Sequence, residues 1–191
     1  MILVIDTSST MAMIATIDET GRMHETVMPA RDPEFVARVR SIAGSETISG
    51  VAVATGPGSF TGLRKGVSFG LGLAMGLRIP IVPLPTLALQ AARSDEPVTA
   101  ISEAGRGRFY YLVPGGEAAL GEPADIPTSH ELVGMISPGA EESLQKAGHR
   151  FKPKSGLRPL VAAAAELLKT AREVPYDSLK LEYMQSFSAA K

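Results

Sequence analysis

The sequence predicts an α/β fold with mixed strand pairing, and three observations carry this prediction. Short apolar runs open the chain and recur near residues 50 and 80. Turn residues separate these runs, and a long apolar segment with helical spacing lies between the last two. With 45% hydrophobic and 20% charged residues, a chain of 191 residues can bury the core of one large domain or two small ones.

The first half of the chain has the clearer elements. Apolar runs predict strands at residues 1–5, 11–17, 22–28, 50–55 and 79–84. Apolar spacing and start signals such as Asp32, followed by Pro33, predict helices at residues 32–43, 60–77 and 86–93. The first three strands are joined by short turns, so they form a meander.

The second half gives weaker signals. We predict strands at residues 98–102 and 108–113, a loop or edge element at 115–127, a capped helix at 128–136 and a helix at 158–170. A loose boundary near residues 94–98 divides an N-terminal lobe, 1–95, from a smaller C-terminal lobe, 96–191. The chain after Pro175 is too short to fold independently.

Charge and composition exclude several functional classes. Nineteen basic and 20 acidic residues give a net charge of −1, which argues against a domain that binds a nucleic-acid backbone by itself. The chain has no cysteine, so it cannot form disulfides or thiolate metal sites, and this composition suits the cytoplasm. The first residues lack a basic signal-peptide region, and the apolar stretch 66–77 falls short of the roughly 20 residues that span a bilayer. We expect a soluble, cytoplasmic protein.

A turn rich in glycine connects the strand at 50–55 to the long helix. Its glycines permit positive φ and close approach of another backbone, and Ser59 can cap the helix. A helix start of this kind can hold an anion. Asp6, Thr7 and Ser8 end the first strand, and with Gly58 and Ser59 they form a candidate loop for Mg²⁺ and a nucleotide phosphate. The alternative is that both segments are ordinary tight turns.

The helix after this turn contains five glycines, each of which costs about 1 kcal/mol relative to alanine. A stripe of small residues recurs every four positions, at Gly62, Gly66, Gly70 and Ala74. A neighbouring apolar stripe contains Leu63, Val67 and Leu71. Small residues let two backbones approach closely, so this face packs either on the protein's own sheet or against a partner helix.

Catalytic machinery is not visible in the sequence. The histidines, at 24, 130 and 149, are too far apart for a paired ligand motif, and Gly62 is not followed by the Lys-Ser/Thr pair of a P-loop. No Gly-x-Ser-x-Gly nucleophile motif surrounds Ser59. We therefore predict no catalytic residue, no metal site and no cofactor.

Three segments closely resemble the TsaB family: residues 5–8 (Ile-Asp-Thr-Ser), 56–64 (Gly-Pro-Gly-Ser-Phe-Thr-Gly-Leu-Arg) and 83–87 (Pro-Leu-Pro-Thr-Leu). The match is dense over residues 1–93. It implies the actin-like ATPase fold (ASKHA, ribonuclease H-like), with two lobes built on βββαβα units. The family's later motifs are altered here: Glu103 and Gly105 replace an acid and an arginine, and residues 181–185 depart from the usual ending. The resemblance thus implies a reduced C-terminal lobe.

The resemblance also implies a function. TsaB-like proteins are non-catalytic subunits that pair with the larger paralogue TsaD, which transfers a threonylcarbamoyl group to the adenosine beside the tRNA anticodon. The ATPase TsaE joins this complex, and tRNA is met only within it. The docking surface includes the helix that follows the glycine-rich turn, which favours the partner interpretation of the small-residue stripe. Self-association of the isolated chain through the same helix stays open.

Two enzyme classes and one RNA contact remain as alternatives. Asp6 and the helix start at Ser59 suit an ATP-hydrolysing enzyme of the same broad fold, although a second phosphate loop and a catalytic acid are not found. A metallopeptidase of the M22 type is the less favoured alternative, since the histidines are scattered. The basic run Arg150, Lys152, Lys154 and Arg158 could contact tRNA, but such a run is more often a solvated loop.

Overall fold

A five-stranded sheet forms the first half of the chain in the order β3-β2-β1-β4-β5 in the computed structural model, which describes residues 1–182. Its strands are β1 (Ile2–Asp6), β2 (Met11–Ile17), β3 (Met23–Pro29), β4 (Gly50–Gly56) and β5 (Ile81–Pro85). β1 pairs antiparallel with β2 and parallel with β4, which confirms the prediction of mixed pairing. The predicted meander is β1, β2 and β3.

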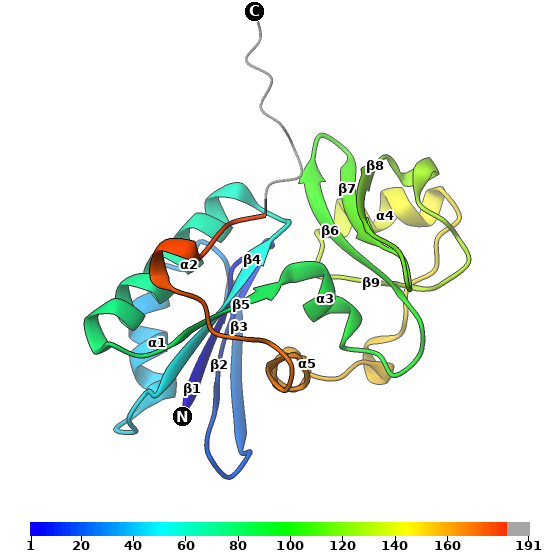
Figure 1. The fold of residues 1–191 in the computed structure, drawn as a ribbon. Helices are drawn as coiled ribbons and strands as arrows, with labels where there is room; N and C mark the ends of the chain where they lie inside the picture. Colours follow the sequence, from blue (N-terminus) through cyan, green and yellow to red (C-terminus); the bar gives the residue numbers. More distant parts are fainter. Residues whose placement is uncertain (183–191) are drawn as a thin grey trace, which may run out of the picture.

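Helices cover both faces of this sheet, because the central strands are apolar on both sides (Figure 1). Leu3, Ile5 and Val53 pack with α1 (Phe35–Ala43) and α2 (Phe60–Leu77). The alternate residues Val4 and Ala52 face the other way and pack with α3 (Thr86–Ala91) and α5 (Leu160–Leu168). Continuous burial on two faces explains why β1 and β4 have unbroken apolar runs.

A second, four-stranded sheet lies beside the first, in the order β8-β7-β6-β9 (Figure 1). Its strands are β6 (Thr99–Gly105), β7 (Arg108–Leu112), β8 (Ala118–Gly121) and β9 (Leu132–Val133). One α-helix and three short 3₁₀ helices complete the described elements: α4 (Pro138–Lys146), η1 (Pro123–Asp125), η2 (Lys154–Gly156) and η3 (Tyr176–Ser178). Leu144 of α4 packs in the core of this sheet with Ile101 and Phe109.

The end of the described chain returns to the first sheet. Val174 forms an isolated bridge with Ile81 of β5, and the N–H of Glu182 donates to the carbonyl of Thr55. Between these points the single O–H of Tyr176 lies within hydrogen-bond distance of two carbonyls at the end of α2, those of Ala74 and Ile79. The division into lobes 1–95 and 96–191 stays a prediction, and both α5 and this returning segment pack against the first sheet.

Two local predictions are wrong, and one helix was missed. Residues 128–136 do not form a helix, because Leu132 and Val133 pair with β6 as the short strand β9. The helix α4 was not predicted, since its sequence has only one buried residue, Leu144, and lacks apolar periodicity. Asp32 does not cap α1, which begins at residue 35; its carboxylate accepts the N–H of Glu34 instead.

Two further expectations can be compared with the described residues. No helix in residues 1–182 combines the length and apolar character needed to cross a membrane. The altered segment 181–185 lies outside the described residues from position 183 onward.

Candidate functional site

The loops that follow β1 and β4 lie together at one edge of the first sheet. This follows from the parallel pairing of β1 and β4, whose carboxyl ends meet there. The N–H of Ser59 donates to the carbonyl of Ser8 at 2.7 Å, and the Thr7 hydroxyl donates to the carbonyl of Gly62, also at 2.7 Å. The structure therefore brings Thr7, Ser8, Gly58 and Ser59 together at the start of α2.

The chain's own atoms fill the space at this helix start. A side chain at Gly58 would lie under 3.0 Å from the carbonyl oxygen of Ser8, and one at Gly62 would lie as close to that of Thr7. The Ser59 hydroxyl accepts the N–H of Gly62 at 3.3 Å, and its carbonyl accepts the N–H of Leu63 at 2.8 Å. These amide groups of the first turn are thus satisfied within the chain.

Asp6, the candidate for holding Mg²⁺, is buried beneath this loop with 3% of its surface exposed. Its carboxylate accepts the N–H of Ser8 at 2.8 Å. Burial raises the pKa of Asp6 above its ordinary value of 3.8, and the hydrogen bonds from Ser8 offset this rise in part. Asp6 therefore holds the loop in shape, which is the role of an acid in a tight turn.

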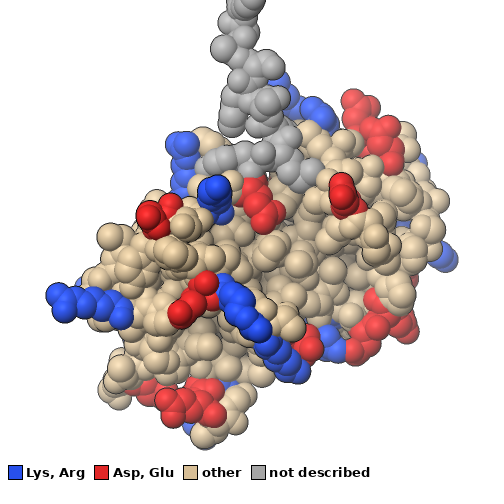
Figure 2. All heavy atoms as spheres, in the orientation of Figure 1, with Lys and Arg blue, Asp and Glu red and all other residues tan. Residues whose placement is uncertain are grey.

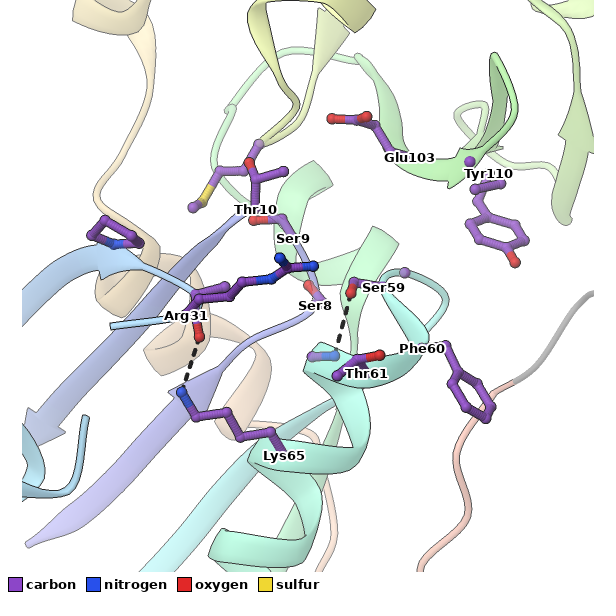
Figure 3. A pocket seen from close by; sticks show the side chains of 17 residues that line it. Ser8, Ser9, Thr10, Arg31, Ser59, Phe60, Thr61, Lys65, Glu103 and Tyr110 are labelled. Carbon is purple, nitrogen blue, oxygen red and sulfur yellow. Dashed lines mark hydrogen bonds between the residues drawn. The ribbon is translucent and has the colours of Figure 1, made fainter. Parts of the chain in front are cut away.

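A cleft of about 690 Å³ opens above the loop, between the two sheets (Figure 3). The first sheet side contributes the residues of the two loops and Arg31, whose side chain extends toward Ser8 and Ser9. The second sheet contributes Glu103 and Tyr110. Sequence reasoning missed Arg31 and Tyr110 as cleft residues, because only the pairing of the two sheets places them opposite the loop.

Glu103 stands where the resembling family has an acid in its second lobe, and its contacts are structural. Its carboxylate accepts the N–H of Ser137 at 2.5 Å and the Ser137 hydroxyl at 3.2 Å. Ser137 is the N-cap residue of α4, so Glu103 supports the start of that helix. Both carboxylate oxygens are engaged in holding α4 against β6.

The small-residue stripe of α2 faces the protein's own sheet. Gly62, Gly66, Gly70 and Ala74 are all buried. A side chain at Gly66 would lie under 3.0 Å from the Thr7 hydroxyl, and one at Gly70 would lie as close to Val53. The expectation that this stripe contacts a partner is therefore wrong: close approach is needed, but by β1 and β4.

The neighbouring apolar stripe belongs to the same interior. Leu63 and Val67 are 1% and 8% exposed, and Leu71 is half-buried against the core of the first sheet. Leu63 and Val67 cannot contact a partner without leaving that core. All seven residues predicted as an interface thus pack inward or lie at the edge of the packed face.

A second set of small residues points outward from α2. Gly72 and Gly76 are exposed, and an added side chain at either would meet nothing within 4 Å. Ser68, also exposed, lies one helical repeat earlier. The signal was present in the sequence, since the five glycines of α2 divide into two sets with different phase on the helix.

Exposed apolar side chains also lie on α1 and α2. Among the described residues six large hydrophobic side chains are exposed, and four of them lie on α1 and α2: Val36 at 46%, Phe60 at 38%, Met75 at 53% and Leu77 at 50%. α1 and α2 also contact one another, since the rings of Phe35 and Phe69 pack edge to face at 5.3 Å. We name the outward side of these two helices the α1–α2 outer face: Val36, Arg40, Ser68, Gly72, Met75, Gly76, Leu77 and Arg78.

The basic run at residues 150–158 is tied to the chain itself. Lys152 forms an ion pair with Glu96, and Arg158 forms one with Asp95. Arg158 also donates to the carbonyl of Ala92 at 3.0 Å. Acidic and basic side chains are interspersed on the face drawn in Figure 2. Two of the four cations therefore fasten this segment to the loop after α3.

The histidines do not come together. His149 is buried and its Nε2 bonds the carbonyl of Pro123 at 2.8 Å, whereas His24 is exposed. Within residues 1–182, no three His, Cys, Asp or Glu side chains are grouped so that they could hold a metal ion.

Comparison with known proteins places this arrangement in a family. A family model described as TsaD, tRNA N6-adenosine threonylcarbamoyltransferase, matches residues 36–182. The Bacillus subtilis tRNA threonylcarbamoyladenosine biosynthesis protein TsaB is 32% identical over 120 residues, which cover 57% of this chain and 52% of that protein. The Haemophilus influenzae protein of the same name is 30% identical over 105 residues, with 50% and 43% covered. The matched region thus spans about half the length of these curated relatives or less.

Solved structures show the fold. A crystal structure from Pseudomonas aeruginosa, described as similar to peptidase YEAZ, has a TM-score of 0.72 at 20% identity and covers 96% of this chain and 99% of that one. YeaZ from the same organism has a TM-score of 0.70, also at 20% identity. These similarities and the two-sheet architecture show the actin-like ASKHA fold. Because the family model matches most of the chain, the chain belongs to the tRNA N6-adenosine threonylcarbamoyltransferase (TsaD) family, in which it is a TsaB/YeaZ-like member.

Proposed function

We propose that this chain is a non-catalytic subunit in the synthesis of N6-threonylcarbamoyladenosine in tRNA, next to the anticodon. It acts by forming a heterodimer with a catalytic TsaD paralogue. The names of the relatives from B. subtilis and H. influenzae support the pathway. The match to the family model for TsaD supports a paralogue of that family as the partner.

The α1–α2 outer face is the observation that carries this proposal. Gly72 and Gly76 could be alanine without any clash within the chain, and alanine would stabilise α2 by about 1 kcal/mol at each position. The fold itself does not explain these glycines. Met75 and Leu77, on either side of Gly76 in the sequence, are exposed, as expected where another protein covers the end of this helix. A partner backbone that approaches at Gly72 and Gly76 accounts for both features.

The filled phosphate loop supports a non-catalytic role. The carbonyls of Thr7 and Ser8 occupy the positions beside Gly62 and Gly58, and Asp6 is buried under them. Two hydrogen bonds, from the Thr7 hydroxyl and from the Ser59 N–H, hold this hairpin on the start of α2. The loop is therefore better suited to hold the fold together than to bind Mg-ATP.

In this proposal the chain encounters tRNA only as part of the complex, in the cytoplasm. The ATPase TsaE is a further partner. The net charge of −1 and the ion pairs of Lys152 and Arg158 support indirect contact with RNA.

Reconstitution tests the proposal. Threonylcarbamoyl transfer to tRNA is measured with the catalytic paralogue and TsaE, with and without this chain. We expect transfer to depend on the chain, and the chain alone to give no product. Equal transfer rates with and without it would refute the proposed role.

A nucleotide-binding enzyme is the second candidate, and the cleft above the loop is the observation that favours it. Its lining includes Ser8, Ser59 and the cation of Arg31. Calorimetric titration of the isolated chain with Mg-ATP separates the two candidates. Binding accompanied by ATP turnover would favour the enzyme, whereas the absence of heat and turnover supports the subunit.

A further inference from the structure

Charge is distributed unevenly between α1 and α2 and the rest of the chain. The segments 35–43 and 60–78 contain five of the 19 basic residues and none of the 20 acidic residues. The basic residues are Arg38, Arg40, Arg64, Lys65 and Arg78. The chain as a whole is nearly neutral, so these two helices form a locally cationic surface.

Three of these cations have contacts within the chain. Arg38 lies 3.7 Å from Glu34, just before α1. Arg64 lies over the ring of Phe60 at 3.9 Å. Lys65 donates to the carbonyl of Ala30 at 2.9 Å and lies over the ring of Phe35. Of these three cations only Arg38 faces a carboxylate, so the two helices keep a positive charge, to which the exposed Arg40 and Arg78 contribute.

Arg40 and Arg78 lie at the same end of the α1–α2 outer face. β3 and β4 run in the same direction, and α1 and α2 each run back from one of them, so the two helices are parallel. Arg40 is in the last turn of α1, and Arg78 is the C-cap of α2. Both are exposed. Arg78 has φ 56°, a left-handed conformation that glycine adopts more readily, yet the position carries a cation.

We infer that the α1–α2 outer face selects a partner helix surface whose border carries carboxylates, and that the same arginines oppose pairing of two copies of this chain. The inference rests on the proposed function, because it names the chemistry of the partner at the same surface. A symmetric homodimer places the same patch on both subunits, so two cationic faces would meet. An acidic partner instead gains attraction and a faster encounter at low salt.

Mixing the native chain with a charge-reversed variant tests the inference that these arginines oppose pairing of two copies of the chain. The variant carries Arg40→Glu and Arg78→Glu, and a second variant carries Arg40→Gln and Arg78→Gln to remove charge without reversing it. Arg106→Glu with Arg108→Glu is the matched control, since both residues are exposed, Arg106 in the turn between β6 and β7 and Arg108 at the start of β7. Sedimentation velocity is recorded at about 0.01 M and about 1 M salt, where the screening length is about 30 Å and about 3 Å.

We expect self-association of the native chain to be weaker at low salt than at high salt. An equimolar mixture of the native chain and the Glu variant should associate at least about tenfold more tightly than the native chain alone at low salt, and lose this gain at high salt. The Gln variant should self-associate more tightly than the native chain at low salt, and the control pair should behave as the native chain does. A native dimer that is strongest at low salt, or a mixture no tighter than the native chain, would overturn the inference.

Titration with the catalytic paralogue tests the other half. Its association rate with the native chain should fall with salt, and the Glu variant should associate at least about tenfold more slowly at low salt. An association rate that changes neither with salt nor with charge reversal would overturn the inference of an acidic partner. The proposed function would still stand. Failure of the paralogue to bind at all would refute the proposed function, and the mixing experiment would still judge the charge inference.

Discussion

Thr7 and Gly62 hold the two loops of the candidate site together through two contacts. The Thr7 hydroxyl donates to the carbonyl of Gly62 at 2.7 Å, and the carbonyl oxygen of Thr7 occupies the space that a side chain at Gly62 would need. The hairpin after β1 is thereby fixed on the first turn of α2. Gly62 is required by the chain's own fold, and this separates the inward glycines of α2 from the outward pair.

Replacing an inward glycine of α2 by alanine should change stability in the opposite direction from replacing an outward one. Gly66→Ala should lower the free energy of unfolding by about 1–3 kcal/mol, because the new methyl group meets the Thr7 hydroxyl and forces the loop to shift. Gly72→Ala should raise it by up to about 1 kcal/mol, because the position is open and alanine favours the helix. Urea denaturation of both variants measures the difference. If Gly66→Ala stabilised the chain as much as Gly72→Ala, the inward packing of α2 would be disproved.

The Asp6→Asn substitution should change how the free energy of unfolding depends on pH. Burial raises the folded-state pKa of Asp6, so the folded state binds its proton more tightly than the unfolded state does. This contribution to stability is complete below pH 3.8 and is lost as pH rises through the raised pKa, at no more than about 1.4 kcal/mol per pH unit.

The asparagine variant has no such loss, and its amide oxygen can still accept the Ser8 N–H. The free energy of unfolding of the variant minus that of the native chain should therefore increase with pH above 3.8 and then level off. Urea denaturation from about pH 3 to about pH 8 measures this difference. A difference that stays constant, or decreases, across that range is inconsistent with a buried carboxyl whose pKa is raised.

The Tyr176→Phe substitution measures how much the returning segment, residues 174–182, contributes to the stability of the fold. The Tyr176 hydroxyl lies 3.2 Å from the carbonyl of Ala74 and 2.9 Å from that of Ile79, at the end of α2. Its removal should lower the free energy of unfolding by about 1 kcal/mol. Tyr111→Phe is the control, since the Tyr111 hydroxyl makes one exposed contact of 3.5 Å. Equal effects of the two substitutions would mean that the returning segment does not stabilise α2.

Much of the first sheet could be predicted from the sequence because its signals are local. Each strand is a short apolar run, and Ser59 caps a helix whose bounds, Phe60–Leu77, agree with the prediction. The resemblance was also concentrated in this half of the chain. The sequence could not show which face of α2 each glycine occupies relative to β1, since that depends on contacts such as the one between Thr7 and Gly62.

The second sheet was harder to predict because its elements depend on distant contacts. β9 is only two residues long and exists because Leu132 and Val133 pair with β6, more than thirty positions earlier in the chain. The α4 helix buries only Leu144, and its capping hydroxyl, Ser137, is held by Glu103 from another strand. Neither feature has a periodic sequence signal.

Binding of the catalytic paralogue to Gly72→Leu tests the central claim most directly. Leucine favours the helix and meets open space in the isolated chain, so stability should be kept or increased, while affinity for the paralogue should fall at least about tenfold. Gly139→Leu is the matched control, because Gly139 is also exposed with open space, on α4. Isothermal titration of all three proteins should show lost affinity for Gly72→Leu alone. Native affinity in a folded Gly72→Leu chain would contradict docking on the α1–α2 outer face.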